Sequence, residues 1–179
     1  MGPGRNDLAY TFYDGIFGPM GLCELLELRP DHPDADRWRN AVDLIARQKC
    51  SMAGRNGWGL IPHYWYSQDP GGGRAAGSAF YRYFYLFQGI TVGVNLDAMA
   101  SAFFLLRAHK LTGEKSFREV ALRQIDWIFG CNPFDASTVE AVGRNQPERL
   151  INTDEFFPPV PQIPGARISG GKLAGVKIH

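Results

Sequence analysis

The chain has 179 residues, 45% of them hydrophobic, which is enough for a domain with an apolar core and argues against disorder. Its 19 lysines and arginines nearly balance 18 aspartates and glutamates, so no broad electrostatic field favours nucleic acid or an anionic membrane as a partner. The three cysteines are widely spaced and form neither a disulfide framework nor a zinc motif. We therefore expect no metal and no cofactor, and we expect Cys23 and Cys131, which lie in apolar stretches, to be buried.

The first residues lack the basic start and apolar run of a signal peptide, and no stretch approaches the roughly 20 apolar residues of a membrane helix. We expect a soluble chain, and its compartment stays open. Aromatic residues make up 13% of the chain, beside 21 glycines and 12 prolines. This combination suits a protein that builds a cleft from shaped loops, but a loop-rich domain with a large aromatic core accounts for it equally well.

Two helices are predicted in the first third of the chain, over residues 10–28 and 34–49. Glycines and Pro19 interrupt the first of them, so we expect its first half to be irregular. Its apolar face comprises Phe12, Ile16, Met20, Leu22, Leu25 and Leu26. The apolar positions of the second recur at steps of three and four, at Trp38, Ala41, Val42, Ile45 and Ala46.

A long connection follows, over residues 51–93, and it is rich in aromatic residues. Loops of this length are usually functional or disordered, and the aromatic density argues against disorder. The alternating run at residues 80–85 predicts either a short strand or an irregular aromatic shelf.

Two further helices are predicted over residues 96–111 and 116–129, joined by a short turn, which is the pattern of an αα-hairpin. Gly130 and the Asn132-Pro133 pair are placed to end the second of them. The expected core faces are Met99, Ala100, Phe103, Phe104, Leu106 and Leu111 in the first, and Phe117, Val120, Ala121, Ile125 and Ile128 in the second. The chain is therefore predicted to be all-α, with two helical hairpins and long aromatic and Pro/Gly-rich loops.

The segment from Gln124 to Pro133, Gln-Ile-Asp-Trp-Ile-Phe-Gly-Cys-Asn-Pro, resembles the end of a late helix in family 9 glycoside hydrolases. Further matching positions follow, at Ser137, Val139, Val142, Gly143, Asn145, Pro147 and the Pro-Gly-Ala of residues 164–166. Residues 111–124 are similar to the helical-hairpin repeat of six-hairpin toroids in general. The resemblance implies an (α/α)6 toroid, of which residues 1–166 would be a part, followed by a Gly-rich tail at residues 167–179.

The resemblance also implies cleavage of β-linked glycans with inversion, by a carboxylate base and a carboxylic acid. Nothing in this chain matches the Asp-Ala-Gly-Asp type motif that carries the family's base, and no Asn-Glu type motif for the acid follows residues 164–166. Residues 149–152, Arg-Leu-Ile-Asn, stand where the family's cellulases have a sugar-binding His-His-Arg. We therefore expect a glycoside hydrolase-like chain that is catalytically incomplete alone.

Two groups of residues are candidates for a site. Asp154 and Glu155 are the only adjacent carboxylates after the last helix, and they are the catalytic candidates, although a solvated loop pair explains them as well. The sugar-binding candidates lie in the aromatic connection, because aromatic faces with polar tips are typical of carbohydrate pockets. They are Trp58, His63, Trp65, Tyr66 and Tyr81, and packing at the rim of the fold is the alternative explanation.

Three functions remain open at this stage. The first is one wall of a glycoside hydrolase-like cleft, with a β-linked glycan as the ligand. The second is a non-catalytic helical-hairpin interaction or scaffold domain that associates with itself or with further hairpins through an apolar face. The third is an epimerase or polysaccharide lyase on the same toroid, since fold does not fix function.

Overall fold

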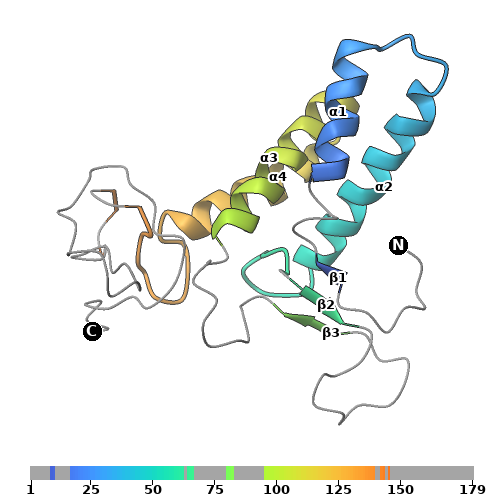
Figure 1. The fold of residues 1–179 in the computed structure, drawn as a ribbon. Coiled ribbons are helices and arrows are strands. Elements are labelled where there is room, and N and C mark those ends of the chain that lie inside the picture. The colour runs from blue at the N-terminus through green and yellow to red at the C-terminus, as the bar shows by residue number, and fades with distance from the viewer. Residues whose placement is uncertain are drawn as a thin grey trace, which may run out of the picture.

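A computed structural model describes residues 9–10, 17–62, 64–66, 80–82, 95–139, 142–143 and 145 of the chain. Four helices dominate it: α1 (Gly18–Leu28), α2 (Ala35–Ala53), α3 (Asn95–Thr112) and α4 (Lys115–Ile128). Consecutive helices pair as two αα-hairpins, α1 with α2 and α3 with α4 (Figure 1). The predicted all-α fold is confirmed. None of the described helices is long and apolar enough to cross a bilayer.

A small antiparallel sheet lies beside the end of α2 (Figure 1). It consists of β1 (Ala9–Tyr10), β2 (Tyr64–Tyr66) and β3 (Phe80–Arg82) in that order. Trp65 is paired with Ala9 on one side and with Tyr81 on the other. Of the two predictions for residues 80–85, the short strand is therefore the one observed at Phe80–Arg82.

The predicted start of the first helix is wrong. Tyr10 lies in strand β1, and α1 begins only at Gly18. Pro19 explains this start, because its fixed φ and missing N–H suit the first turn of a helix. Phe12 and Ile16, predicted for the apolar face of this helix, lie outside the described residues.

All four helices contribute to one core. Phe104 of α3 and Phe117 of α4 are completely buried in it, together with Val42 and Ala46 of α2 and Cys23 of α1. Ion pairs at the rim connect the hairpins: Arg107 Nη2 lies 2.8 Å from a carboxylate oxygen of each of Glu24 and Glu27. The core therefore joins both hairpins into one packed unit.

The predicted core face of the third helix was partly wrong. Met99 and Phe103 are exposed, whereas Ala98, Ala102, Leu105 and Ala108 are buried. Apolar residues surround α3 on nearly every side, so periodicity could not identify the buried face. The small side chains of Ala98, Ala102 and Ala108 let neighbouring helices approach closely, and they decide which face packs.

The turn between α3 and α4 is fixed by backbone and side-chain caps. Gly113 has a φ of +76° and donates its N–H to His109 O at 2.7 Å, which closes α3 with a left-handed residue. The Glu114 carboxylate accepts the backbone N–H of Ser116 at 3.2 Å and so caps α4. This hydrogen bond holds the pKa of Glu114 below its usual value.

Lys49 is an unusual member of the buried stripe of α2. It is only 3% exposed, one turn after Ala46, and none of the described residues forms an ion pair with its ammonium group. Burial lowers the pKa of Lys49 to about 8 from an ordinary value of 10.5. Between these two values the unfolded chain binds more protons than the folded chain, so the contribution of Lys49 to stability increases as the pH rises through this window.

We predict that Lys49→Met raises the free energy of unfolding at pH 7 by about 1–3 kcal/mol, because it removes a buried charge that none of the described residues neutralises. The variant should also lose the part of the pH dependence that Lys49 causes between pH 8 and 10.5. Urea unfolding across this range measures both effects. Lys115→Met, at an exposed lysine, is the control and should change neither. A loss of stability at pH 7 in the Lys49 variant would contradict the prediction.

Candidate functional site

The loop after α4 is organised by the side-chain amide of Asn132. Its Nδ2 donates to Trp127 O and to Ala136 O, each at 2.8 Å. Its Oδ1 accepts the backbone N–H of Phe134 at 3.1 Å. Gly130 permits this turn because its φ is +117°, which a residue with a side chain rarely adopts. The predicted helix stop at Gly130 and Asn132 is confirmed, with α4 ending at Ile128.

The same loop is tied back to the start of α3. Asn95 is buried, and its Nδ2 donates to Thr138 Oγ1 at 2.8 Å. Thr138 in turn donates both its hydroxyl and its backbone N–H to Ile128 O, at 3.0 and 2.9 Å. Because buried polar groups are costly unless paired, this chain of hydrogen bonds fixes the loop against both helices of the hairpin.

A second loop, residues 54–62, follows α2 and is organised by Asn56. The Oδ1 of Asn56 accepts the backbone N–H groups of Trp58 and Leu60, at 3.2 and 3.0 Å. Its Nδ2 donates to Leu60 O at 2.8 Å and to Ala53 O at 3.1 Å. One side chain therefore holds the backbone on both sides of Trp58.

Gln124 fastens this loop to α4. Its side chain is fully buried, with its Oε1 accepting Ile61 N–H at 2.9 Å and its Nε2 donating to Gly59 O at 2.7 Å. A third hydrogen bond joins Nε2 to Val120 O at 3.0 Å. The loop and the helix are 63 residues apart in sequence at the Ile61 contact, so this amide is a long-range connection between the two hairpins.

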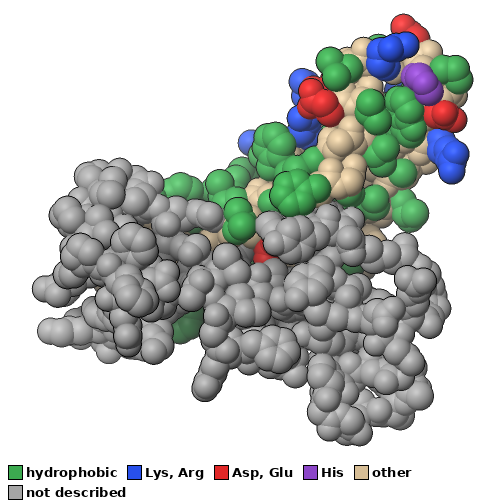
Figure 2. Space-filling view, viewed as in Figure 1, with side chains coloured by type: hydrophobic (Ala, Val, Ile, Leu, Met, Phe, Trp, Pro, Cys, Tyr) green, Lys and Arg blue, Asp and Glu red, His purple; other side chains and the backbone are tan. Residues whose placement is uncertain are grey.

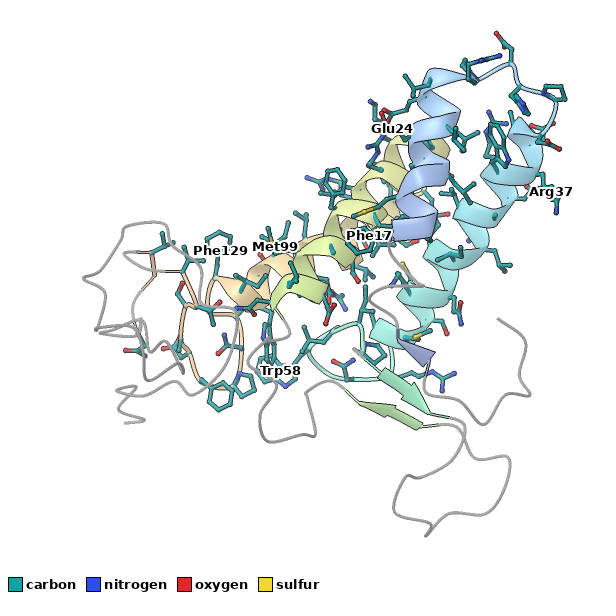
Figure 3. The ribbon with its side chains drawn as sticks, viewed as in Figure 1. Phe17, Glu24, Arg37, Trp58, Met99 and Phe129 are labelled. Atoms are coloured by element: carbon teal, nitrogen blue, oxygen red, sulfur yellow. The ribbon has the colours of Figure 1, made fainter. Side chains whose placement is uncertain are left out.

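These bonds present Trp58 at the surface. Its side chain is 49% exposed and lies beneath the α3/α4 hairpin in Figure 3. Its ring forms a T-shaped contact with the nearly buried ring of Trp127, with ring centroids 5.8 Å apart and an interplanar angle of 78°. Trp127, Leu60, Ala98 and Ile128 form a second apolar cluster under this contact. An exposed ring on a rigid apolar base is a surface that stacks against a flat ligand.

The structure describes some of the predicted site residues and not others. Trp58 is at the surface, as a binding residue must be. The structure gives the strand pairing of Trp65, Tyr66 and Tyr81. In this pairing Trp65 and Tyr81 are directly opposite each other. His63, Asp154 and Glu155 lie outside the described residues.

Two features were not anticipated by the sequence. Cys131 is exposed, in contrast to the predicted burial, because it follows the helix stop at Gly130 and belongs to the loop; Cys23 is buried as predicted. Trp127 was not predicted to be a site residue, although it lies on α4 where its ring contacts the ring of Trp58. The sequence signal that could have identified Trp127 was the Gln124–Pro133 segment, in which this aromatic residue follows Gln124 by one helical turn.

The described helices and loops define a helical-hairpin protein whose loops are held against α4. Comparison with family models identifies the family: the model of glycosyl hydrolase family 9 matches residues 64–154, just over half of the chain. The chain belongs to glycosyl hydrolase family 9 and is glycoside hydrolase-like. The match includes α3, α4 and the loop built on Asn132, and it covers residues 111–154 of the region that carried the resemblance. Searches of curated proteins and of solved structures gave no match.

The two glycines beside Trp58 allow a matched test of the loop. Gly59 has a φ of +69°, and a Cβ there would lie 2.6 Å from Cδ of Arg123. Gly57 has open space around a Cβ. We predict that Gly59→Ala lowers the free energy of unfolding by about 1–3 kcal/mol through backbone strain and this clash, whereas Gly57→Ala changes it by less than about 0.5 kcal/mol. Equal effects in chemical denaturation would show that the observed loop conformation is wrong.

Proposed function

We propose that this chain forms one wall and part of the aromatic floor of a cleft that binds a β-linked glycan. The observation that carries the proposal is Trp58, an exposed ring whose backbone is held on both sides by Asn56 and Gln124. Membership of glycosyl hydrolase family 9 supports a carbohydrate as the ligand. The rigid loop supports binding further, because a ring that is already ordered loses little conformational entropy when a sugar stacks on it.

Hydrolysis is a separate matter, since inverting cleavage needs a base and an acid on opposite sides of the scissile bond. The chain has no match to the motif that carries the family's base. We propose that it binds glycans but does not hydrolyse them alone, with the adjacent carboxylates Asp154 and Glu155 as its catalytic candidates. Asp154 is the last residue of the family match.

Calorimetric titration with cello-oligosaccharides tests binding, and release of reducing sugar tests hydrolysis. We predict that Trp58→Ala weakens binding about threefold to tenfold through loss of stacking. Trp38→Phe is the control, since Trp38 stacks on His32, on the turn between α1 and α2, and should bind as the unchanged chain does. We predict release of reducing sugar at background level, because loss of each catalytic carboxylate typically costs a factor of about 10²–10⁴.

Two results would contradict this proposal. Unchanged affinity in Trp58→Ala would remove Trp58 from the binding surface. Robust turnover that is abolished by Asp154→Asn or Glu155→Gln would make that pair the catalytic centre and the chain a complete enzyme.

A second proposal, self-association, is favoured by an apolar surface on α3. Leu96, Met99 and Phe103 are all exposed and lie at steps of three and four, so they share one face of the helix. Phe129, at the adjoining end of α4, is exposed as well. Hydrophobic side chains gather along this edge of the hairpin in Figure 2, and Met99 and Phe129 are labelled on it in Figure 3. Burying this α3 face against another hairpin would stabilise the chain by about 25 cal/mol per Å² of apolar area.

We predict that the chain is oligomeric in sedimentation velocity and that Phe103→Glu shifts it towards the monomer. The control is Leu44→Glu, at an exposed leucine on α2 away from this face. It introduces the same charge and should leave the distribution unchanged. A monodisperse monomer at high concentration would contradict self-association and leave glycan binding unaffected.

A further inference from the structure

Arg123 lies on the same face of α4 as Trp127, one helical turn earlier, and it packs on the loop that carries Trp58. The contact depends on Gly59: a Cβ at that position would be 2.6 Å from Cδ and 3.1 Å from Nη1 of Arg123. The methylenes of Arg123 therefore rest on the bare backbone of Gly59, with a nitrogen of the guanidinium beside it. The guanidinium therefore lies beside Gly59, the residue that follows Trp58 in the chain.

Among the described residues, no carboxylate forms an ion pair with Arg123. Arg39, Arg47 and Arg107 form ion pairs with carboxylates on their own or neighbouring helices. Arg123 is exposed and forms no ion pair or hydrogen bond with the residues that the structure describes, although the exposed Asp126 stands three residues away on the same helix. The contact with Gly59 holds the side chain along the loop instead.

We infer that the surface at Trp58 selects a glycan that carries a carboxylate, that is, a β-linked chain containing uronic acid units. This inference rests on the proposed glycan binding and specifies in addition that the glycan is negatively charged. A sugar ring stacks on Trp58, and its carboxylate accepts the N–H groups of Arg123, whose planar fork matches a carboxylate in two parallel hydrogen bonds. The methylene packing on Gly59 restricts the side chain before the ligand arrives, so less entropy is lost on binding.

The test compares a cello-oligosaccharide with one of equal length oxidised to the acid at C6, by calorimetry at low and high salt. We expect the acidic ligand to bind about threefold to tenfold more tightly in 50 mM salt, with most of the difference lost in 500 mM salt. Arg123→Gln should remove this preference and leave the affinity for the neutral ligand within about twofold. Arg123→Lys should retain part of it, because the charge remains but the fork is lost.

Arg118→Gln is the matched control, since it removes an exposed arginine from the same helix on a different face. It should keep the full preference, and if it abolishes the preference instead, general charge rather than Arg123 is responsible. Equal affinity for both ligands in the unchanged chain, or a preference that persists in Arg123→Gln, overturns the inference and leaves glycan binding standing. Failure of both ligands to bind overturns the proposed function and the inference with it. A preference for sulfated over C6-oxidised ligand of equal length would overturn the assignment to uronic acids.

Discussion

The buried amide of Gln124 is the interaction on which the geometry of the candidate site depends. Its oxygen and nitrogen hold the backbone of Ile61 and Gly59 against α4 through direct hydrogen bonds of 2.9 and 2.7 Å. Leaving a buried N–H or C=O without a partner costs about 1–3 kcal/mol each, so the loop has a strong preference for this one position. Trp58 lies one residue before Gly59, and its direction follows from that position.

Other side-chain amides act in the same way. Asn56 shapes the loop from inside, Asn132 shapes the loop after α4, and Asn95 joins that second loop to α3 through Thr138. An amide offers both donors and an acceptor without charge, so it can satisfy several backbone groups in an apolar setting with little desolvation cost. The two loops of the site are therefore held to the helices by direct hydrogen bonds, which suits the binding of a rigid sugar ring.

The helices could be predicted from the sequence because their periodicity and end signals are local. Gly130 and Asn132 ended α4 where expected, and the short turn at Gly113 identified the hairpin. The buried face of α3 could not be predicted, since apolar residues cover most of its circumference and only packing against the other helices decides between them. The start of α1 was placed too early because its glycine-rich first half retained a helical period.

The candidate site was predicted in part. Trp58 could be proposed from the aromatic composition of its loop, but its partner Trp127 lies 69 residues later and was hidden within a helix face. The role of Gln124 was also hidden, because a polar residue in a sequence gives no sign of which distant backbone groups it will meet. Asn56, by contrast, bonds only backbone groups within four residues of it.

Native-state hydrogen exchange of the Ile61 amide in the Gln124→Met variant tests this account most directly. Methionine has nearly the same shape as glutamine but cannot accept the Ile61 N–H. The account predicts that protection of Ile61 falls by at least about tenfold relative to the amide of Phe104 in α3, corresponding to roughly 1.4 kcal/mol. Unchanged protection of Ile61 relative to Phe104 would contradict it, because the loop would then be held in place by something other than Gln124.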